Sequence, residues 1–132
     1  MNYLLDTNVC IHFFCGKFNL LEKLQQIGIK NCAISEITLA ELAFGAENSS
    51  KPRHNHKIVN SFTEQLSILP IFNSIDIYAK EKVRLRKDGE MISDFDLLIG
   101  STAVANNLIM VTEDTKGFQR IFGIKLENWV KR

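Results

Sequence analysis

Acidic side chains at the ends of apolar segments are the residues of this sequence best suited to chemistry. Asp6 follows the apolar run Tyr3–Leu5 and is the only charged side chain between Met1 and Ile11. Such a run is typical of a buried strand, and ligands of open α/β sheets bind outside the carboxyl ends of the strands. An isolated buried carboxylate is strongly disfavoured, so Asp6 is a candidate ligand. Capping of a helix by Asp6 and Asn8 is the alternative.

Three other carboxylates stand inside or beside apolar segments. Glu41 is the only charged residue in the stretch 37–44, and no helix end accounts for it there. Asp96 precedes the uncharged stretch Leu97–Thr112, and Asp114 lies just beyond that stretch. Helix capping is an alternative role for Asp96, and turn formation is an alternative role for Asp114.

Carboxylates that converge in one pocket repel one another and raise each other's pKa values unless cations neutralise them. Mg²⁺ and Mn²⁺ prefer oxygen ligands and suit such a site. A bound divalent cation can activate water and stabilise negative charge on a phosphate. The four residues therefore predict a metal site suited to phosphodiester hydrolysis. Asp94 has the same capping explanation as Asp96 and is left out of the candidate site.

Short apolar segments alternate with longer helical ones along the chain. Strands are predicted at 3–5, 32–34, 68–72, 108–111 and 125–129. Helices are predicted from residue 7 or 9 to Gly16, at 19–26, 36–44, 52–66 and 75–87, from Ser93 to Asn106, and at 116–121. This alternation predicts an α/β fold with a parallel sheet covered on both faces.

Composition sets the class of protein. With 132 residues, 45% hydrophobic and 23% charged, the chain is expected to form one domain over residues 1–132. It has no run of about eighteen apolar residues and no signal-like start, so neither a membrane span nor secretion is expected. Cys10, Cys15 and Cys32 are odd in number and form no C-x-x-C pair, which indicates reduced thiols and a cytoplasmic location.

Several segments of the sequence, taken together, resemble the PIN-domain family, and within it the VapC-type toxin ribonucleases of bacterial toxin–antitoxin pairs. The matching segments are Leu5-Asp6-Thr7-Asn8, Ser35 to Gly45 (SEITLAELAFG), Asp94 to Ala103 (DFDLLIGSTA), Val111 to Phe118 (VTEDTKGF) and Leu126 to Trp129 (LENW). They follow in this order over nearly the whole chain, which makes the resemblance specific, whereas Asp-Thr-Asn alone would be weak.

The resemblance implies a three-layer α/β/α sandwich with a central, mostly parallel sheet. It also implies hydrolysis of RNA that depends on Mg²⁺, or on Mn²⁺, and leaves a 3′-hydroxyl and a 5′-phosphate. The resemblance assigns catalytic and metal-ligand roles to Asp6, Glu41, Asp96 and Asp114. Supporting polar roles pass to Asn8, Ser35, Thr38 and Thr112. Close relatives often carry Asn at the position of Asp114, so contact to the metal through water is an alternative for that residue.

The same resemblance implies a toxin endoribonuclease that cuts tRNA or other structured RNA, inhibits translation and is neutralised by a cognate VapB-type antitoxin. It further implies a homodimer with no membrane attachment. The alternative is a catalytically silent PIN-fold module that binds antitoxin or nucleic acid. The presence of all four acidic residues favours the enzyme.

Basic residues gather in two places although the formal net charge is only +1. The helix predicted at 75–87 carries Lys82 and four candidate contacts to RNA phosphates, namely Lys80, Arg84, Arg86 and Lys87. A second group follows a polar connector and contains Arg53, His54, His56 and Lys57. A solvated helix surface is the alternative explanation for both groups.

Overall fold

The structure is a computed structural model and describes residues 1–132. Its strands are β1 (Tyr3–Leu5), β2 (Cys32–Ser35), β3 (Ser67–Leu69), β4 (Ile109–Val111) and β5 (Lys125–Glu127). Its α-helices are α1 (Thr7–Phe14), α2 (Leu20–Ile27), α3 (Glu36–Glu47), α4 (Pro52–Thr63), α5 (Ile75–Lys87), α6 (Asp94–Ala105) and α7 (Thr115–Phe118). Two 3₁₀ turns, η1 (Ile29–Asn31) and η2 (Phe72–Ser74), precede β2 and α5.

The strands form one sheet, and every neighbouring pair in it is parallel, in the order β3-β2-β1-β4-β5. Tyr3 of the central strand β1 is in register with Cys32 of β2 and with Ile109 of β4. The chain adds β2 and β3 on one side of β1 and then β4 and β5 on the other. The order in which strands are added therefore reverses between β1 and β4. Open α/β sheets bind ligands at such a switch point.

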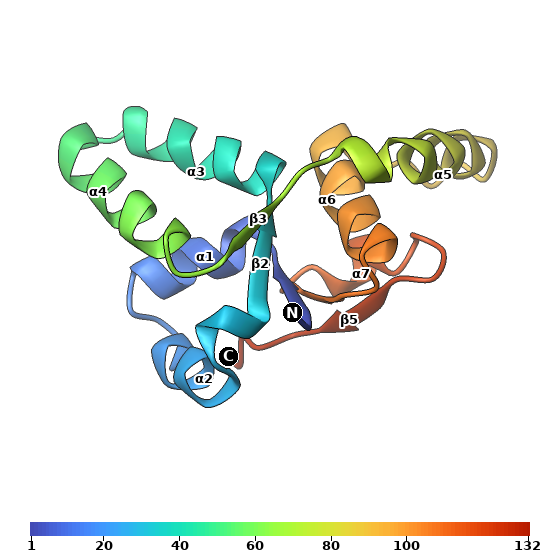
Figure 1. Ribbon diagram of the computed structural model, residues 1–132. Helices are drawn as coiled ribbons and strands as arrows, with labels where there is room; N and C mark the ends of the chain where they lie inside the picture. The colour runs from blue at the N-terminus through green and yellow to red at the C-terminus, as the bar shows by residue number, and fades with distance from the viewer.

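Alternate side chains of each strand enter two separate cores, one on each face of the sheet. Leu5 packs on the face covered by α1, α2, α3 and α4, together with Val9 and Phe62. Leu4 packs on the opposite face with Leu97 of α6, below α5, α6 and α7. Figure 1 shows the two helical layers on either side of the sheet. The predicted three-layer α/β/α fold is confirmed.

Two helical pairs extend beyond the carboxyl ends of the strands. In Figure 1, α3 and α4 form an arm on the left, and α5 and α6 form an arm on the right. Helix α3 packs along α4 and also touches α1 and α6. The helices that begin at the carboxyl end of the sheet are therefore close to one another at their starts.

Most predicted elements are present, with changes at their ends. The helix predicted to end near Phe44 continues through Gly45 to Glu47, and the helix predicted to reach residue 66 ends at Thr63. The strand predicted at 68–72 is only Ser67–Leu69, because Pro70 has no N–H for a ladder and the chain turns into η2. The strand predicted at 125–129 ends at Glu127, and the short helix before it ends at Phe118.

No helix of this chain has the length and apolar character needed to cross a membrane.

Close packing of α6 against the segment after α7 gives a test of the fold. A Cβ added at Gly100 would lie 2.3 Å from Cδ1 of the buried Ile121, whereas a Cβ at Gly45 would meet no atom within 4 Å. Gly100→Ala should lower the free energy of unfolding by about 1–3 kcal/mol through overpacking. Gly45→Ala should raise it by about 0.5–1 kcal/mol through helix propensity. Urea denaturation measures both, and a Gly100→Ala protein as stable as the wild type would contradict this packing.

Candidate active site

Asp6 lies at the switch point of the sheet, directly after β1. It is only 5% exposed and caps α1 by accepting a hydrogen bond from the N–H of Thr7 over 2.8 Å. Its other carboxylate oxygen accepts a hydrogen bond from the hydroxyl of Thr112 over 2.8 Å. Helix capping, the alternative role considered for Asp6, therefore does occur. It coexists with a second contact that comes from the end of β4.

Glu41 reaches the same place from the middle of α3. The Thr7 hydroxyl donates to Oε1 of Glu41 over 2.7 Å and lies 3.1 Å from the Thr38 hydroxyl. Helix α3 starts directly after β2 because the buried Ser35 caps it, accepting from the N–H of Ile37 over 3.0 Å. One turn of helix then places Thr38, and a second turn places Glu41, beside the start of α1.

Asp96 and Asp114 approach from the other side of β1. Asp96 is half-buried in the first turn of α6, where its N–H donates to the Ser93 hydroxyl over 3.2 Å. Asp114 is exposed, and its N–H donates to the hydroxyl of Thr112 over 3.0 Å. Its carboxylate caps α7 by accepting from the N–H of Gly117 over 3.1 Å. Thr112 thus connects the backbone of Asp114 with the carboxylate of Asp6.

Burial and neighbouring carboxylates raise the pKa values of Asp6 and Asp96. Burial raises the pKa of Asp6 from 3.8 to about 6, hydrogen bonds from Thr112 and Thr7 oppose this rise, and the charges of Asp96 and Glu41 add to it. Burial also raises the pKa of Asp96, and the charge of Asp114 contributes to that rise. The fold therefore gathers all four acidic residues into one electrostatically coupled group.

The supporting residues divide into those inside this group and one outside it. Ser35, Thr38 and Thr112 are buried. Thr112 donates to Asp6, Thr38 is hydrogen-bonded to Thr7, and Ser35 caps α3. Asn8 is exposed in the first turn of α1, and its side chain makes no hydrogen bond. Sequence reasoning missed Thr7, whose hydroxyl joins α1 to Glu41. A threonine directly after a capping aspartate was the available signal, but the direction of its hydroxyl depends on how α1 packs against α3.

The donor set suits a hard divalent cation, because it consists of carboxylate and hydroxyl oxygens. Burial raises the pKa of Asp6, and only hydrogen bonds from Thr112 and Thr7, with no neighbouring positive charge, act to lower it. No three acidic, histidine or cysteine side chains are arranged so that together they could hold a metal ion. Glu41, for example, is engaged by Thr7. Direct ligation by three carboxylates would therefore require side-chain rotations.

Two of the four cations predicted to contact RNA on α5 are paired with acidic neighbours. Lys80 pairs with Asp76 over 3.0 Å, and Arg84 pairs with Glu81 over 2.8 Å. Arg84 also donates to the carbonyl of Arg120 over 2.7 Å, so it ties α5 to the segment after α7. Arg86 and Lys87 are exposed and form no ion pair.

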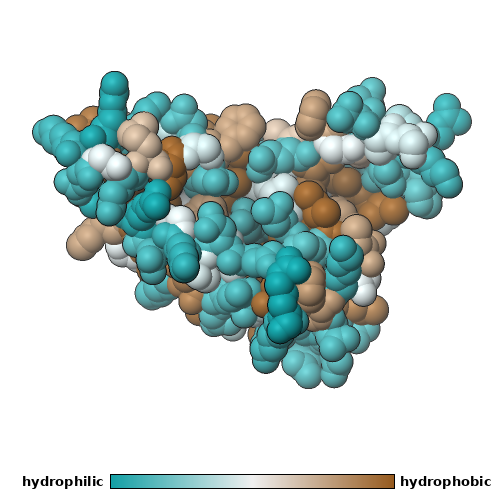
Figure 2. All heavy atoms as spheres, turned by 180° about the vertical axis from the view of Figure 1, so that it is seen from behind, coloured by the Kyte–Doolittle hydropathy of each residue, from teal (hydrophilic) through white to brown (hydrophobic).

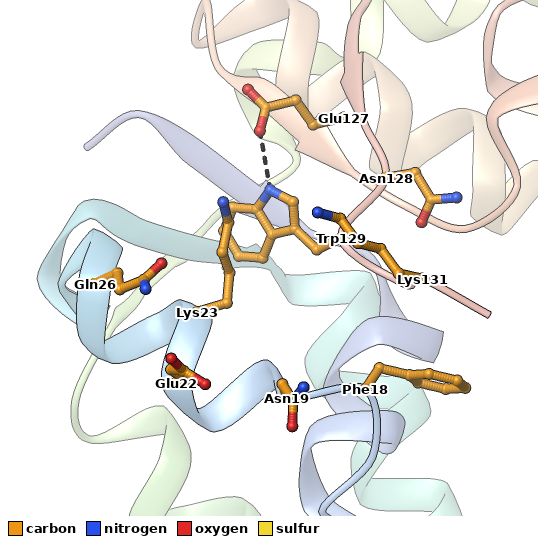
Figure 3. A pocket seen from close by; sticks show the side chains of 9 residues that line it. All are labelled: Phe18, Asn19, Glu22, Lys23, Gln26, Glu127, Asn128, Trp129 and Lys131. Atoms are coloured by element: carbon orange, nitrogen blue, oxygen red, sulfur yellow. Dashed lines mark hydrogen bonds between the residues drawn. The ribbon is translucent and has the colours of Figure 1, made fainter.

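Two hollows near the sheet have different characters. A pocket of about 460 Å³ lies between α2 and the segment after β5 (Figure 3). At its side, Trp129 is 6% exposed, and its indole N–H donates to Glu127 over 2.9 Å. Lys23 lies over the indole ring at 5.4 Å from its centroid. The contact between Lys23 and Trp129 joins the end of the chain to α2. None of the four carboxylates lines this pocket.

The second hollow, which we call the apolar groove, adjoins the candidate site. It has a volume of about 310 Å³ and lies between α1, α3 and α4. Its walls are mainly apolar and include Ile11, Phe14, Ala46 and Ile58, and Glu41 stands at its edge. Figure 2, the view from behind, shows hydrophobic surface gathered below the arm on its right side, which carries α3 and α4.

The structure is thus a parallel α/β/α fold with four acidic residues at the switch point of its sheet. The PIN domain family model matches residues 3–123. The chain belongs to the PIN-domain family.

Similar proteins cover the chain from end to end. Ribonuclease VapC2 of Rickettsia felis is 37% identical, covering 99% of this chain and 100% of the relative. The tRNA(fMet)-specific endonuclease VapC of Salmonella typhimurium is 31% identical, and the match covers 98% of each chain. Among solved structures, the DNA-bound VapBC complex from Salmonella typhimurium contains a chain with a TM-score of 0.91 and 30% identity, with 98% of each chain covered.

The raised pKa of Asp6 predicts a dependence of stability on pH. Because folding raises this pKa from 3.8 to about 6, the protonated form stabilises the fold in full below pH 3.8, and this stabilisation is lost as pH rises through 6. Without divalent cations, Asp6→Asn should therefore raise the free energy of unfolding at pH 7 by about 1–3 kcal/mol. Most of this gain should disappear near pH 4.

Chemical denaturation in chelator measures this effect. Asp76→Asn, which removes an exposed carboxylate on α5, is the matched control and should change stability by less than about 0.5 kcal/mol. An Asp6→Asn protein that is no more stable than the wild type at pH 7 would show that the buried charge is already compensated.

Proposed function

We propose that this protein is a toxin endoribonuclease that hydrolyses RNA phosphodiester bonds with the help of Mg²⁺, Mn²⁺ being an alternative metal. The observation that carries this proposal is the coupled group of Asp6, Glu41, Asp96 and Asp114 at the switch point of the sheet, with the raised pKa of Asp6. Full-length similarity to proteins named as ribonucleases supports it.

Each acidic residue has a distinct part in the proposed reaction. After the side-chain rotations that direct ligation requires, Asp6, Glu41 and Asp96 would hold the principal cation, and Asp114 would help to bind it or a second one, directly or through water. When bound, the cation activates water for in-line attack and stabilises negative charge on the phosphate. Thr112 holds Asp6 in position through its hydroxyl, and Thr7 does the same for Glu41. Neither histidine nor lysine touches these four carboxylates, so the proposal assigns no side chain as general base.

The proposed substrate is tRNA or another structured RNA in the cytoplasm. One relative is named as a tRNA(fMet)-specific endonuclease, and cleavage of tRNA would stop translation. The cytoplasmic location agrees with three free cysteines, Cys10, Cys15 and Cys32. A catalytically silent binding module is the alternative function, but buried Asp6 would then carry an electrostatic cost without a role.

The proposed partner is a VapB-type antitoxin that occupies the apolar groove. Solved complexes of relatives are VapBC complexes. The groove suits an apolar segment of a partner, and a basic side chain at its end could reach Glu41 and the neighbouring acidic residues. We also propose a homodimer, for which Ile75 and Val83 provide exposed apolar surface on α5, 47% and 53% exposed.

Charge removal at the site tests the nuclease. Asp6→Asn or Asp96→Asn should reduce cleavage of tRNA by at least about 100-fold while the fold persists, because each removes a ligand of the cation. The assay follows cut ends on denaturing gels with Mg²⁺ or with chelator, and circular dichroism checks the fold. Asp76→Asn, on the exposed surface of α5, should cleave at the wild-type rate. Full activity of the folded wild type after removal of metal would contradict the mechanism.

Partner binding in the apolar groove has its own test. Ile11→Arg should weaken antitoxin binding by about tenfold or more, because it places a long charged side chain in the groove. Leu21→Arg, at an exposed leucine of α2 outside the groove, is the control. Calorimetric titration with the antitoxin measures both affinities. Equal affinity of Ile11→Arg and wild type would place the antitoxin on another surface.

A further inference from the structure

A group of basic side chains without acidic partners covers the start of α4. It consists of Lys51, Arg53, His54 and Lys57, and we call it the basic surface of α4. None of its side chains takes part in an ion pair. The neighbouring His56 differs, because it pairs with Glu47 over 2.8 Å. The first turn of α4 contains no acidic residue, so this surface lacks local compensation.

The arrangement differs from that of α5, where three basic residues have acidic partners and the two without one, Arg86 and Lys87, lie in the last turn, where positive charge complements the helix dipole. Lys80, Lys82 and Arg84 each pair with a carboxylate of α5 or α6. Positive side chains beside the first turn of a helix also oppose the helix dipole. The basic surface of α4 is therefore unfavourable for folding, and a bound anion would offset that disadvantage.

Three hollows that share lining residues lie between this surface and Glu41. The apolar groove, with Glu41 at its edge, shares Phe14 and Ile58 with a hollow of about 420 Å³. That hollow shares His54 and Lys57 with a third one of about 360 Å³, which Lys51 and its neighbours line.

The distance along these three hollows suits a strand of nucleic acid. Helix α3 rises about 9 Å between Glu41 and its end at Glu47. Figure 1 shows α4 starting at that outer end of the arm and running back beside α3. The connector is fixed, because Asn55 donates to the Ser49 hydroxyl over 2.8 Å. A strand cut at the carboxylates would need to extend only a few nucleotides to reach the basic surface.

The middle hollow adds aromatic side chains to these cations. Phe13 and Phe14 are half-buried and line it together with His54 and Lys57. A positively charged groove with aromatic walls is the combination by which proteins bind unpaired RNA, with phosphates on the cations and bases against the rings. The basic side chain proposed for the antitoxin would be repelled by these cations, whereas RNA phosphates would be attracted, so charge favours RNA as the occupant.

We propose that the basic surface of α4 binds phosphates of the RNA strand beside the bond that is cut, and that the hollow at Phe13 and Phe14 receives an unpaired base of that strand. This inference rests on the proposed function, because the occupant is the substrate of the proposed nuclease. It moves the main RNA contact from α5, where the sequence predicted it, to α4.

Two double variants with equal loss of charge test the proposal. Arg53→Gln with Lys57→Gln removes two exposed cations of α4, and Arg86→Gln with Lys87→Gln removes two exposed cations of α5. Binding of unfractionated tRNA is measured in chelator at several salt concentrations. The α4 variant should bind at least about tenfold more weakly, and its salt slope should fall by about 1.4, the value for two single-strand phosphate contacts. The α5 variant should stay within about twofold of the wild type.

Kinetics and cross-linking add independent readouts. In Mg²⁺ the α4 variant should show a raised KM with kcat unchanged at saturating tRNA. Photo-cross-linking of the wild type to RNA that contains 4-thiouridine, mapped by mass spectrometry, should label the peptides of Phe13–Phe14 and His54–Lys57. Melting curves verify that both double variants are folded.

Other outcomes overturn the proposal. Wild-type tRNA affinity of the α4 variant, or an equal or larger loss in the α5 variant, would refute it. So would weakened binding of the antitoxin with unchanged binding of tRNA, which would assign the surface to the protein partner. If the wild type cuts no RNA in Mg²⁺ but the α4 variant still loses tRNA binding, the RNA surface stands and the nuclease function fails.

Discussion

Burial of an acidic side chain among other carboxylates at one end of a parallel sheet is the constraint on which this structure depends. Asp6 is buried beside two other acidic residues, and its pKa rises to about 6 because burial and their charges disfavour ionisation. Hydrogen bonds from Thr112 and from the backbone of Thr7 oppose that rise and hold the carboxylate in place. Such a group adds no stability to the fold, and in the proposed function a divalent cation would offset its charge.

The fold brings these carboxylates together through ordinary features of α/β architecture. Parallel strands bring their carboxyl ends to the same edge, and the switch between β1 and β4 leaves room there between helices. Helices α1, α3 and α6 all start near that edge, each capped by a side chain of the preceding residue. Two cores, one on each face, fix the sheet between the layers. The stability of the cores allows the protein to keep an unfavourable charge group at one end.

Much of this arrangement could be predicted from the sequence, for physical reasons that apply to particular residues. Asp6 and Glu41 stand alone in apolar segments, and an acid in such a place has few purely structural explanations. Ser35 and Ser93 mark helix starts through capping, and α5 has the predicted bounds. The confirmed α/β class follows from the alternation of strands and helices.

The remaining features depend on contacts between distant segments. The role of Thr7 was missed because its hydroxyl can donate to Glu41 only when α1 packs against α3. The observed edge strand β3 is shorter than the strand predicted at 68–72, because Pro70 ends its hydrogen-bond ladder. The basic residues of α5 and α4 look alike in the sequence. They differ in part in the fold. Lys80 and Arg84 of α5 have acidic partners, Arg86 and Lys87 of α5 have none, and Arg53 and Lys57 of α4 have none either.

Cation binding at the four carboxylates can be measured directly through the protons that it displaces. Mg²⁺ titrated calorimetrically in buffers of different ionisation enthalpy should release about half a proton per ion at pH 6, where Asp6 is about half protonated, and almost none at pH 8. Asp6→Asn should abolish this pH-dependent release. Binding without proton release at pH 6, or no binding of Mg²⁺ at either pH, would contradict the claim that a divalent cation relieves the repulsion among these residues.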